Sequence, residues 1–115
     1  MRKEFTFHTS DGTGLYMVQD VTAPPKAAVI IVHGLCEHLG RYEYLTERLC
    51  ERNLMVYRFD HRGHGKSEGK RVYYDCFETI SDDVNEVAER VKSHNEGLPL
   101  FIIGHSMGGY AVSCF

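Results

Sequence analysis

The sequence predicts an α/β protein with a largely parallel sheet and helices on both of its faces. Three short apolar runs, at residues 27–32, 54–59 and 99–103, have the texture of strands that are buried on both sides. A helical pattern separates each run from the next. Strands that alternate with helices in this way form βαβ units, whose crossovers are right-handed.

An antiparallel hairpin is expected before these units. Phe5 and Phe7 alternate with polar residues, and residues 15–18 form a second apolar strand. Residues 10–14 (Ser-Asp-Gly-Thr-Gly) supply the turn, because glycine tolerates positive φ and aspartate bonds to its own backbone. The prolines at 24 and 25 then stop the ladder, since proline has no N–H to donate.

Two helices are expected between the apolar runs. The first ends near Asn53, and the second ends at residues 95–97 (Asn-Glu-Gly). Asp82 and Asp83 are placed in the first turn of the second helix, where the helix dipole favours negative charge. The apolar positions, spaced by three and four residues, are Tyr42, Leu45 and Leu49 in the first helix and Ile80, Val84, Val87 and Val91 in the second.

Composition limits the class of protein. The 115 residues are enough for one domain, and the mixture of apolar and charged residues is typical of soluble globular proteins. A net charge of −3 without a Lys/Arg cluster argues against a nucleic-acid partner. The apolar run at residues 27–32 is far too short to span a bilayer, and no signal peptide is recognised. Four cysteines without pairing or metal spacing predict free thiols and a cytoplasmic location.

The third apolar run leads directly into the motif Gly104-His105-Ser106-Met107-Gly108, which fits G-x-S-x-G. Between a strand and a helix, this pattern predicts a nucleophile elbow that exposes the serine hydroxyl above the sheet. A glycine-rich turn with an incidental serine is the alternative. The first apolar run ends in His33-Gly34-Leu35, a second motif at a strand end, and the two together favour the elbow.

These motifs resemble the α/β-hydrolase superfamily, in particular the monoacylglycerol lipase and lysophospholipase (serine aminopeptidase-like) branch. The segments that carry the resemblance are VHGLCEHLGRY (32–42), DHRGHGKSEG (60–69) and GHSMGG (104–109). The resemblance implies that Ser106 is the nucleophile and that the N–H groups of Leu35 and Met107 form the oxyanion hole. It also implies that Gly104 and Gly108 are the elbow glycines. The supporting loop residues would be His33, Gly34, Asp60, Gly63 and Gly65.

Residues 65–67 (Gly-Lys-Ser) raise a second possibility, a phosphate-binding loop. That loop needs a glycine five residues before Gly65, where this sequence has Asp60. No helix is expected to start at Ser67 either. The segment is therefore predicted to be a structural turn beside the active site, in which Asp60 and Arg62 bond locally.

The acid and the base of the catalytic triad are expected to follow the nucleophile in this fold, and neither is predicted within the 115 residues. Residues 1–115 are thus expected to be the N-terminal part of a single hydrolase domain, without its cap, and the last strand is expected to be a bare edge. No histidine here is expected to serve as base: His33 should be structural and His105 a packing residue. No metal site and no cofactor are predicted.

The predicted function is hydrolysis of carboxylic esters such as monoacylglycerols or lysophospholipids through an acyl-enzyme on Ser106, although this chain alone is expected to be inactive. A small ester or lipid is the expected partner, with possible membrane contact through a cap, and the oligomeric state is open. An aminopeptidase or a thioesterase of the same fold is one alternative. A non-catalytic remnant that only binds is another.

Overall fold

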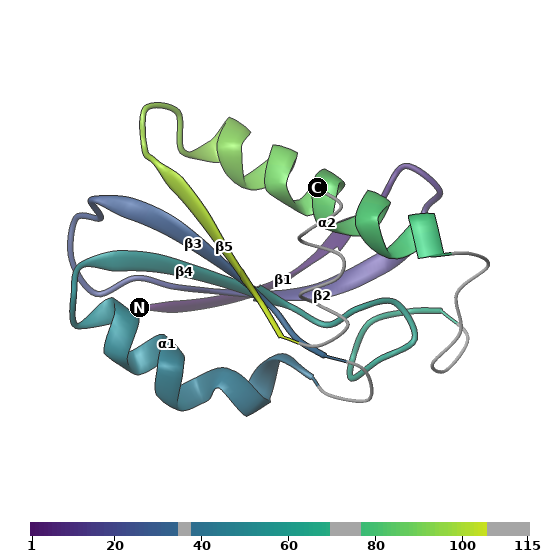
Figure 1. Cartoon of the computed structure of the whole chain (residues 1–115), viewed down its shortest axis with the longest axis horizontal. Coiled ribbons are helices and arrows are strands. Elements are labelled where there is room, and N and C mark those ends of the chain that lie inside the picture. The colour runs from purple at the N-terminus through teal and green to yellow at the C-terminus, as the bar shows by residue number, and fades with distance from the viewer. Residues whose placement is uncertain (35–37, 70–76, 106–115) are drawn as a thin grey trace.

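In the computed structural model the chain forms a five-stranded sheet of order β1-β2-β4-β3-β5, with helix α1 on one face and helix α2 on the other (Figure 1). The structure describes residues 1–34, 38–69 and 77–105. The predicted class, an N-terminal hairpin followed by βαβαβ units, is confirmed.

The hairpin consists of β1 (Arg2–His8) and β2 (Gly14–Asp20), which pair antiparallel with Phe5 opposite Met17. Phe7, Leu15 and Met17 are buried in the core beneath α2. β2 also pairs antiparallel with β4, with Met17 opposite Phe59, so the hairpin extends the parallel part of the sheet.

The parallel part comprises β3 (Ala27–Val32), β4 (Leu54–Phe59) and β5 (Leu100–Gly104). β3 lies between the other two, and all six of its residues are buried. The three strands agree with the predicted runs to within one residue at each end.

Helix α1 (Glu43–Cys50) follows a short 3-10 turn, η1 (Leu39–Tyr42), and α2 (Phe77–His94) is the longer helix. The apolar positions predicted for α2 are all buried against the sheet. Asn53, with φ of 61°, ends the α1 segment as predicted. The placement of Asp82 and Asp83 was wrong, because α2 begins at Phe77 and both residues lie beyond its first turn.

β5 is the edge strand, as predicted, but it is not buried on both faces. Phe101 and Ile103 are 58% and 39% exposed. They lie opposite Val29 and Ile31, on the face covered by α1, whose apolar residues pack over β3 and β4 and do not reach β5. Leu100 and Ile102 point to the other face and pack into the core beneath α2.

The charged side chain of Arg58 is buried within the sheet. The Arg58 side chain, in β4, is 1% exposed and pairs with Asp20 of β2 at 2.9 Å and Glu43 of α1 at 2.9 Å. It also donates to the carbonyl of Leu39 at 3.1 Å. A buried arginine is tolerated only with partners of this kind, so Arg58 fixes α1 to the sheet.

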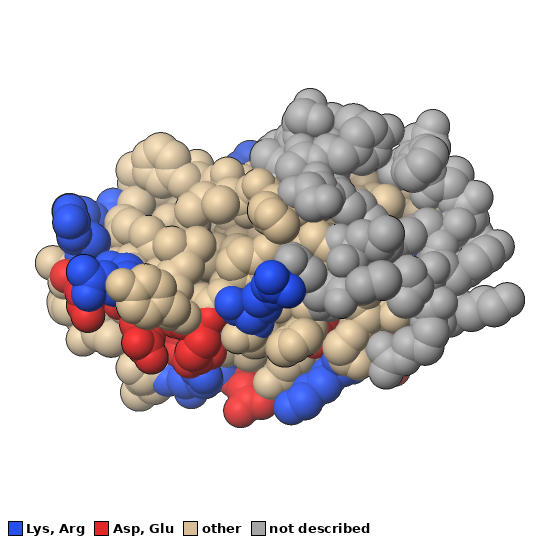
Figure 2. Space-filling model, turned by 60° about the horizontal axis from the view of Figure 1, so that its bottom comes forward, with Lys and Arg blue, Asp and Glu red and all other residues tan. Residues whose placement is uncertain are grey.

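The described surface carries both signs of charge. In Figure 2 basic and acidic side chains are interspersed on the face shown. Among the described residues no helix is long and apolar enough to cross a membrane.

The buried strand β3 and the edge strand β5 should respond differently when an isoleucine is truncated to alanine. Ile30→Ala, at a fully buried position, should lower the free energy of unfolding by about 2–5 kcal/mol, because it leaves a cavity in the core. Ile103→Ala, at a partly exposed position on the edge strand, should cost clearly less. Urea denaturation of the two variants measures the difference, and equal losses would contradict the assignment of β5 as an uncovered edge.

Candidate active site

The carboxyl ends of the three parallel strands meet at one edge of the sheet (Figure 1). Val32 lies opposite Phe59 on one side and Gly104 on the other. The residue after β5, His105, donates its N–H to the Val32 carbonyl at 3.2 Å. The loops that follow β3, β4 and β5 therefore start next to one another, at the edge where open α/β sheets bind their ligands.

Asp60, the first residue after β4, connects these loops. Its Oδ1 accepts from the N–H of Leu39 at 2.7 Å, and its Oδ2 accepts from the N–H of Lys66 at 2.9 Å. Its own N–H donates to the Tyr16 carbonyl of β2 at 2.9 Å. Asp60 is 2% exposed, so its carboxylate is stabilised by backbone donors in place of water.

Gly65 leaves room for that carboxylate. Its φ of 49° lies in the left-handed region, and a Cβ built on it would stand 2.3 Å from Oδ2 of Asp60. The loop can close over the carboxylate only because residue 65 has no side chain.

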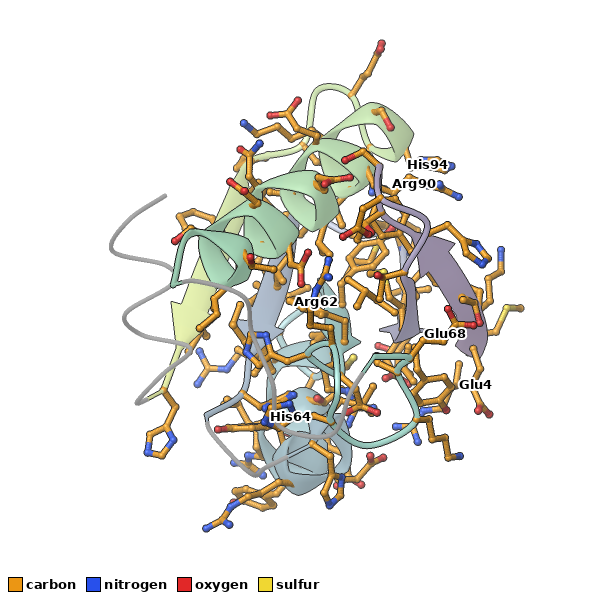
Figure 3. All side chains as sticks on the ribbon, turned by 90° about the vertical axis from the view of Figure 1, so that its right-hand side faces the viewer. Glu4, Arg62, His64, Glu68, Arg90 and His94 are labelled. Carbon is orange, nitrogen blue, oxygen red and sulfur yellow. The ribbon has the colours of Figure 1, made fainter. Side chains whose placement is uncertain are left out.

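A cluster of three buried histidines, whose rings meet edge to face or tilted, lies beside Asp60. The rings of His33 and His61 are 4.3 Å apart, and the ring of His64, which is labelled in Figure 3, is 5.3 Å from that of His33. The N–H of His61 donates to His33 Nε2 at 2.9 Å, and His33 Nδ1 lies 2.7 Å from the Gly34 carbonyl. His33 is therefore neutral, with its proton on Nδ1.

The same cluster determines the hydrogen bond and the pKa of His61. Its Nε2 lies 2.9 Å from the carbonyl of His33 and donates to it. Burial lowers the pKa of His61 to about 3, and the neighbouring His33 ring adds to the effect. These paired bonds between His33 and His61 connect the loop after β3 to the loop after β4.

Arg62 extends the connection to α2 (Figure 3). Its guanidinium binds both oxygens of Asp83 at 2.8 and 2.9 Å and also pairs with Asp11 of the β1–β2 turn at 3.0 Å. The expectation that Arg62 bonds locally holds for its carbonyl, which lies 3.1 Å from His64 Nδ1, but not for its side chain, whose partners are both distant in sequence. Asp60 bonds both locally and across to the loop after β3.

The rest of the loop excludes a phosphate-binding loop, as expected. The Ser67 hydroxyl is buried, donates to the Asp60 carbonyl at 2.5 Å and accepts from the N–H of Tyr16 at 2.8 Å. No helix begins at Ser67. Gly63, with φ of 73°, donates its N–H to the Glu68 carbonyl and so closes the turn.

The predicted site residues fall into two groups. Those in the described residues come together at the carboxyl edge of the sheet: His33, Gly34, Asp60, Gly63, Gly65 and Gly104. Leu35, Ser106, Met107 and Gly108 lie outside the described residues, so their roles stay predictions.

Sequence reasoning missed two features and misplaced a third. His61 and His64 were not singled out, and both are buried. Arg58 was overlooked, although a charged residue within an apolar strand is a visible signal. His105 was expected to pack, but its side chain is exposed. Among the described residues, no group of three or more His, Cys, Asp or Glu side chains is arranged so that it could hold a metal ion.

Solved structures with the same fold define the class of protein. A lipase in its open form matches 96% of this chain and 38% of its own with a TM-score of 0.83, at 24% identity. A thermostable carboxyl esterase from Bacillus coagulans, solved with glycerol, matches 96% and 38% with a TM-score of 0.84, at 26% identity. The fold is that of the α/β-hydrolases.

Sequence comparison gives the family. Residues 23–115 match the family described as serine aminopeptidase, S33, and the chain belongs to that family of serine hydrolases. It is 43% identical to human monoglyceride lipase over 88 residues, and this aligned segment covers 76% of this chain and 29% of that protein. It is 37% identical over 105 residues to the monoacylglycerol lipase of Mycolicibacterium smegmatis, covering 89% and 38%. The chain thus spans about a third of the length of these relatives.

The contact between Gly65 and Asp60 can be tested by Gly65→Ala. The added methyl group would clash with the carboxylate, so the free energy of unfolding should fall by about 1–3 kcal/mol more than in the control Gly12→Ala. Gly12 also has positive φ, of 88°, but a Cβ there meets no atom within 4 Å. Thermal or urea denaturation measures the free energy of unfolding of both variants. Equal losses of stability would show that the cost at residue 65 comes from backbone strain alone and not from contact with Asp60.

The buried His61 predicts an acid-sensitive site. Its folded pKa, about 3, lies below that of an unfolded histidine, so the unfolded chain binds the extra proton first. Stability due to neutral His61 is complete above about pH 6.5 and is lost toward pH 3, by about 1.4 kcal/mol per pH unit. Unfolding free energies at pH 7 and pH 5 should differ less in His61→Phe than in the wild type. The control His8→Phe, at an exposed histidine, should keep the wild-type difference in unfolding free energy between pH 7 and pH 5. If that difference shrinks equally in both variants, burial of His61 is not the cause of the acid sensitivity.

Proposed function

We propose that residues 1–115 are the N-terminal, nucleophile-bearing part of a serine hydrolase domain that cleaves carboxylic esters, with Ser106 as the nucleophile. The observation that carries the proposal is the position of Gly104. It ends β5 in register with Val32, next to the loop that begins at His33. A serine two residues after Gly104 and an oxyanion-binding loop after β3 would then face the same space.

The reaction would begin when the hydroxyl of Ser106 attacks the ester carbonyl. The N–H groups of Leu35 and Met107 would bind the oxyanion that forms, and one such donor typically contributes ~10²–10³ in rate. Collapse of the intermediate expels the alcohol and leaves an acyl-enzyme, which water then hydrolyses. Gly104 and Gly108 would permit the sharp turn of the elbow. The proposed chemistry uses no metal and no organic cofactor.

The framework around Asp60, His33 and His61 would support this reaction by positioning the loop after β3. A donor contributes to transition-state stabilisation only when it is held in place before the oxyanion forms. The bond from Leu39 to Asp60 and the bonds between the two histidines restrain that loop at both of its ends. None of these groups needs to touch the substrate.

The general base and its acid partner would come from outside these residues. His33 and His61 use both their backbone and ring groups to bind each other, and they are assigned a structural role. The relatives of the chain are about two and a half times as long, which leaves room for both partners and for a cap that would contact lipid. We place the protein in the cytoplasm, with its cysteines as free thiols; Cys50 is buried and free.

The proposed substrates are monoacylglycerols or lysophospholipids, because the relatives named above are monoglyceride and monoacylglycerol lipases. An aminopeptidase is the second candidate, since the matched family carries that description. A thioesterase or a binding-only remnant would share the same framework. A panel of ester, thioester and amino-acyl amide substrates separates the three activities.

Ser106→Ala is the direct test. Rates of monoacylglycerol hydrolysis should be measured for the 115-residue protein and for the protein expressed from the coding frame read past Phe115. Each protein is assayed with and without the substitution. If Ser106 is the nucleophile, activity found in either form should fall to background, because no other group replaces an acyl-accepting hydroxyl.

Ser93→Ala is the matched control, since Ser93 is an exposed serine near the end of α2 and should leave the rate unchanged. Full activity in Ser106→Ala would rule out the proposed nucleophile. Absence of hydrolysis in both the chain and the extended frame would favour the binding-only remnant.

A further inference from the structure

The backbone of Leu39 is held on both sides by charged side chains from the end of one strand. Its N–H donates to Oδ1 of Asp60 at 2.7 Å, and its carbonyl accepts from Nη1 of Arg58 at 3.1 Å. Arg58 lies two residues before Asp60, so both side chains project from the carboxyl end of β4 toward the same face. Leu39 is buried, and hydrogen bonds to charged groups are stronger than those between neutral groups. Together Arg58 and Asp60 form what we call the Leu39 clamp.

The guanidinium of Arg58 belongs to a closed ring of four charges. Asp20 accepts from Arg58 Nη2 at 2.9 Å through one carboxylate oxygen and from Arg2 Nε at 2.8 Å through the other. Glu43 accepts from Arg58 Nη1 at 2.9 Å and, through its other oxygen, from Arg2 Nη2. Two cations and two anions thus alternate around the ring. It joins β1, β2, β4 and α1, so elements that are distant in sequence hold the guanidinium of Arg58.

The ring stabilises the buried guanidinium and fixes its position. The side chain of Arg58 is 1% exposed, and a buried charge that loses its partner is strongly destabilising. The bond from Arg2 holds the pKa of Glu43 below its ordinary value, so this half-exposed carboxylate stays charged and keeps its bond to Arg58. Nη1 of Arg58 donates to both Glu43 and the Leu39 carbonyl. The ring therefore sets where the donor to Leu39 lies.

The Leu39 clamp lies at the end of the loop after β3. This loop begins at His33, whose ring accepts from the N–H of His61 at 2.9 Å, and it ends where η1 starts at Leu39. In the sequence, Leu35 lies between these two anchors. Anchoring both ends of a short loop reduces the conformations open to the residues between them. An N–H group that stabilises an oxyanion contributes fully only when it is fixed before the reaction.

We propose that Arg58 is a positioning residue for the proposed oxyanion-binding loop. Arg58 holds the Leu39 carbonyl in place, and Arg2 fixes the guanidinium of Arg58 through the two carboxylates that they share. Strand β1 thereby acts on the site without touching the substrate. The catalytic part of this inference rests on the proposed roles of Ser106 and Leu35, whereas the clamp itself can be measured without catalysis.

Amide hydrogen exchange of the 115-residue protein, followed by NMR, measures the clamp directly. Arg58→Met keeps a long side chain but removes the charge. The Leu39 and Gly40 amides should then exchange about tenfold faster, because a charge-assisted bond is lost. The Gly40 N–H is informative because it shares a peptide unit with the Leu39 carbonyl. Amides of β3 report global unfolding, so the increase at Leu39 and Gly40 must exceed any increase in that strand.

Arg2→Gln is the matched control for Arg58→Met. Arg2 binds the same two carboxylates as Arg58 but forms no hydrogen bond to Leu39, and its side chain is 42% exposed. Exchange of the Leu39 and Gly40 amides should therefore rise by at most about fivefold in this variant. The proposal is overturned if Arg58→Met leaves both amides at the wild-type rate, or if the two variants accelerate them equally.

Glu43→Gln takes the place of Arg58→Met if that variant does not fold. Glu43 is half-exposed, and losing its charge weakens the ring, so the Leu39 amide should exchange about two- to fivefold faster. Glu47→Gln is its control, because Glu47 is an exposed residue of the same helix outside the ring and should leave the exchange rate unchanged. Wild-type exchange in Glu43→Gln, or equal rates in both variants, overturns the proposal.

The catalytic consequence is tested with the protein expressed from the coding frame read past Phe115. Arg58→Met should lower kcat for monoacylglycerol hydrolysis about tenfold with little change in KM, because an oxyanion donor acts mainly in the transition state. A normal kcat in Arg58→Met, with Ser106→Ala inactive, would overturn the positioning role and leave the proposed nucleophile intact. If no form hydrolyses the ester, the positioning role fails together with the proposed function, and the exchange rates alone decide whether the clamp exists.

Discussion

The carboxylate of Asp60 is the interaction on which the rest of the candidate site depends. It stands at the end of β4 and accepts one backbone N–H from the loop after β3 and another from its own loop, through Leu39 and Lys66. A buried carboxylate is costly unless donors of this kind surround it, and here both donors are backbone groups that side-chain substitution does not remove. The absence of a side chain at Gly65 is the steric condition for this arrangement.

Two further links make the edge of the sheet a single unit. The bond that His33 Nε2 accepts from the His61 N–H requires the His33 ring to be neutral, and burial favours the neutral form of His61. Arg62 then ties the loop to α2 and to the hairpin through Asp83 and Asp11. A framework of this type fits a site whose chemistry depends on donors fixed in advance, which agrees with membership of a family of serine hydrolases.

The two ends of the sheet have different characters. At the carboxyl end, buried polar groups satisfy one another and form a scaffold. At the amino end, beneath the last turns of α2, Lys3 and Arg90 are exposed and form no ion pair with a described residue, and Arg90 lies over the Phe7 ring. The buried Arg58 shows that this chain neutralises a cation where the fold requires it, with Asp20 and Glu43.

The sequence alone determined the elements and their order, because apolar periodicity and turn chemistry are local properties; β3, β4, α1 and the hairpin follow from it. It also determined the family, through motifs at successive strand ends. Only the tertiary structure decided which polar residues meet. The pairing of Arg62 with Asp83, the ring contacts of His33 and the exposure of Phe101 depend on how distant segments pack, and no local pattern encodes such distances. The placement of Asp82 and Asp83 failed for a related reason, since α2 begins at Phe77, before the two aspartates from which its first turn was inferred.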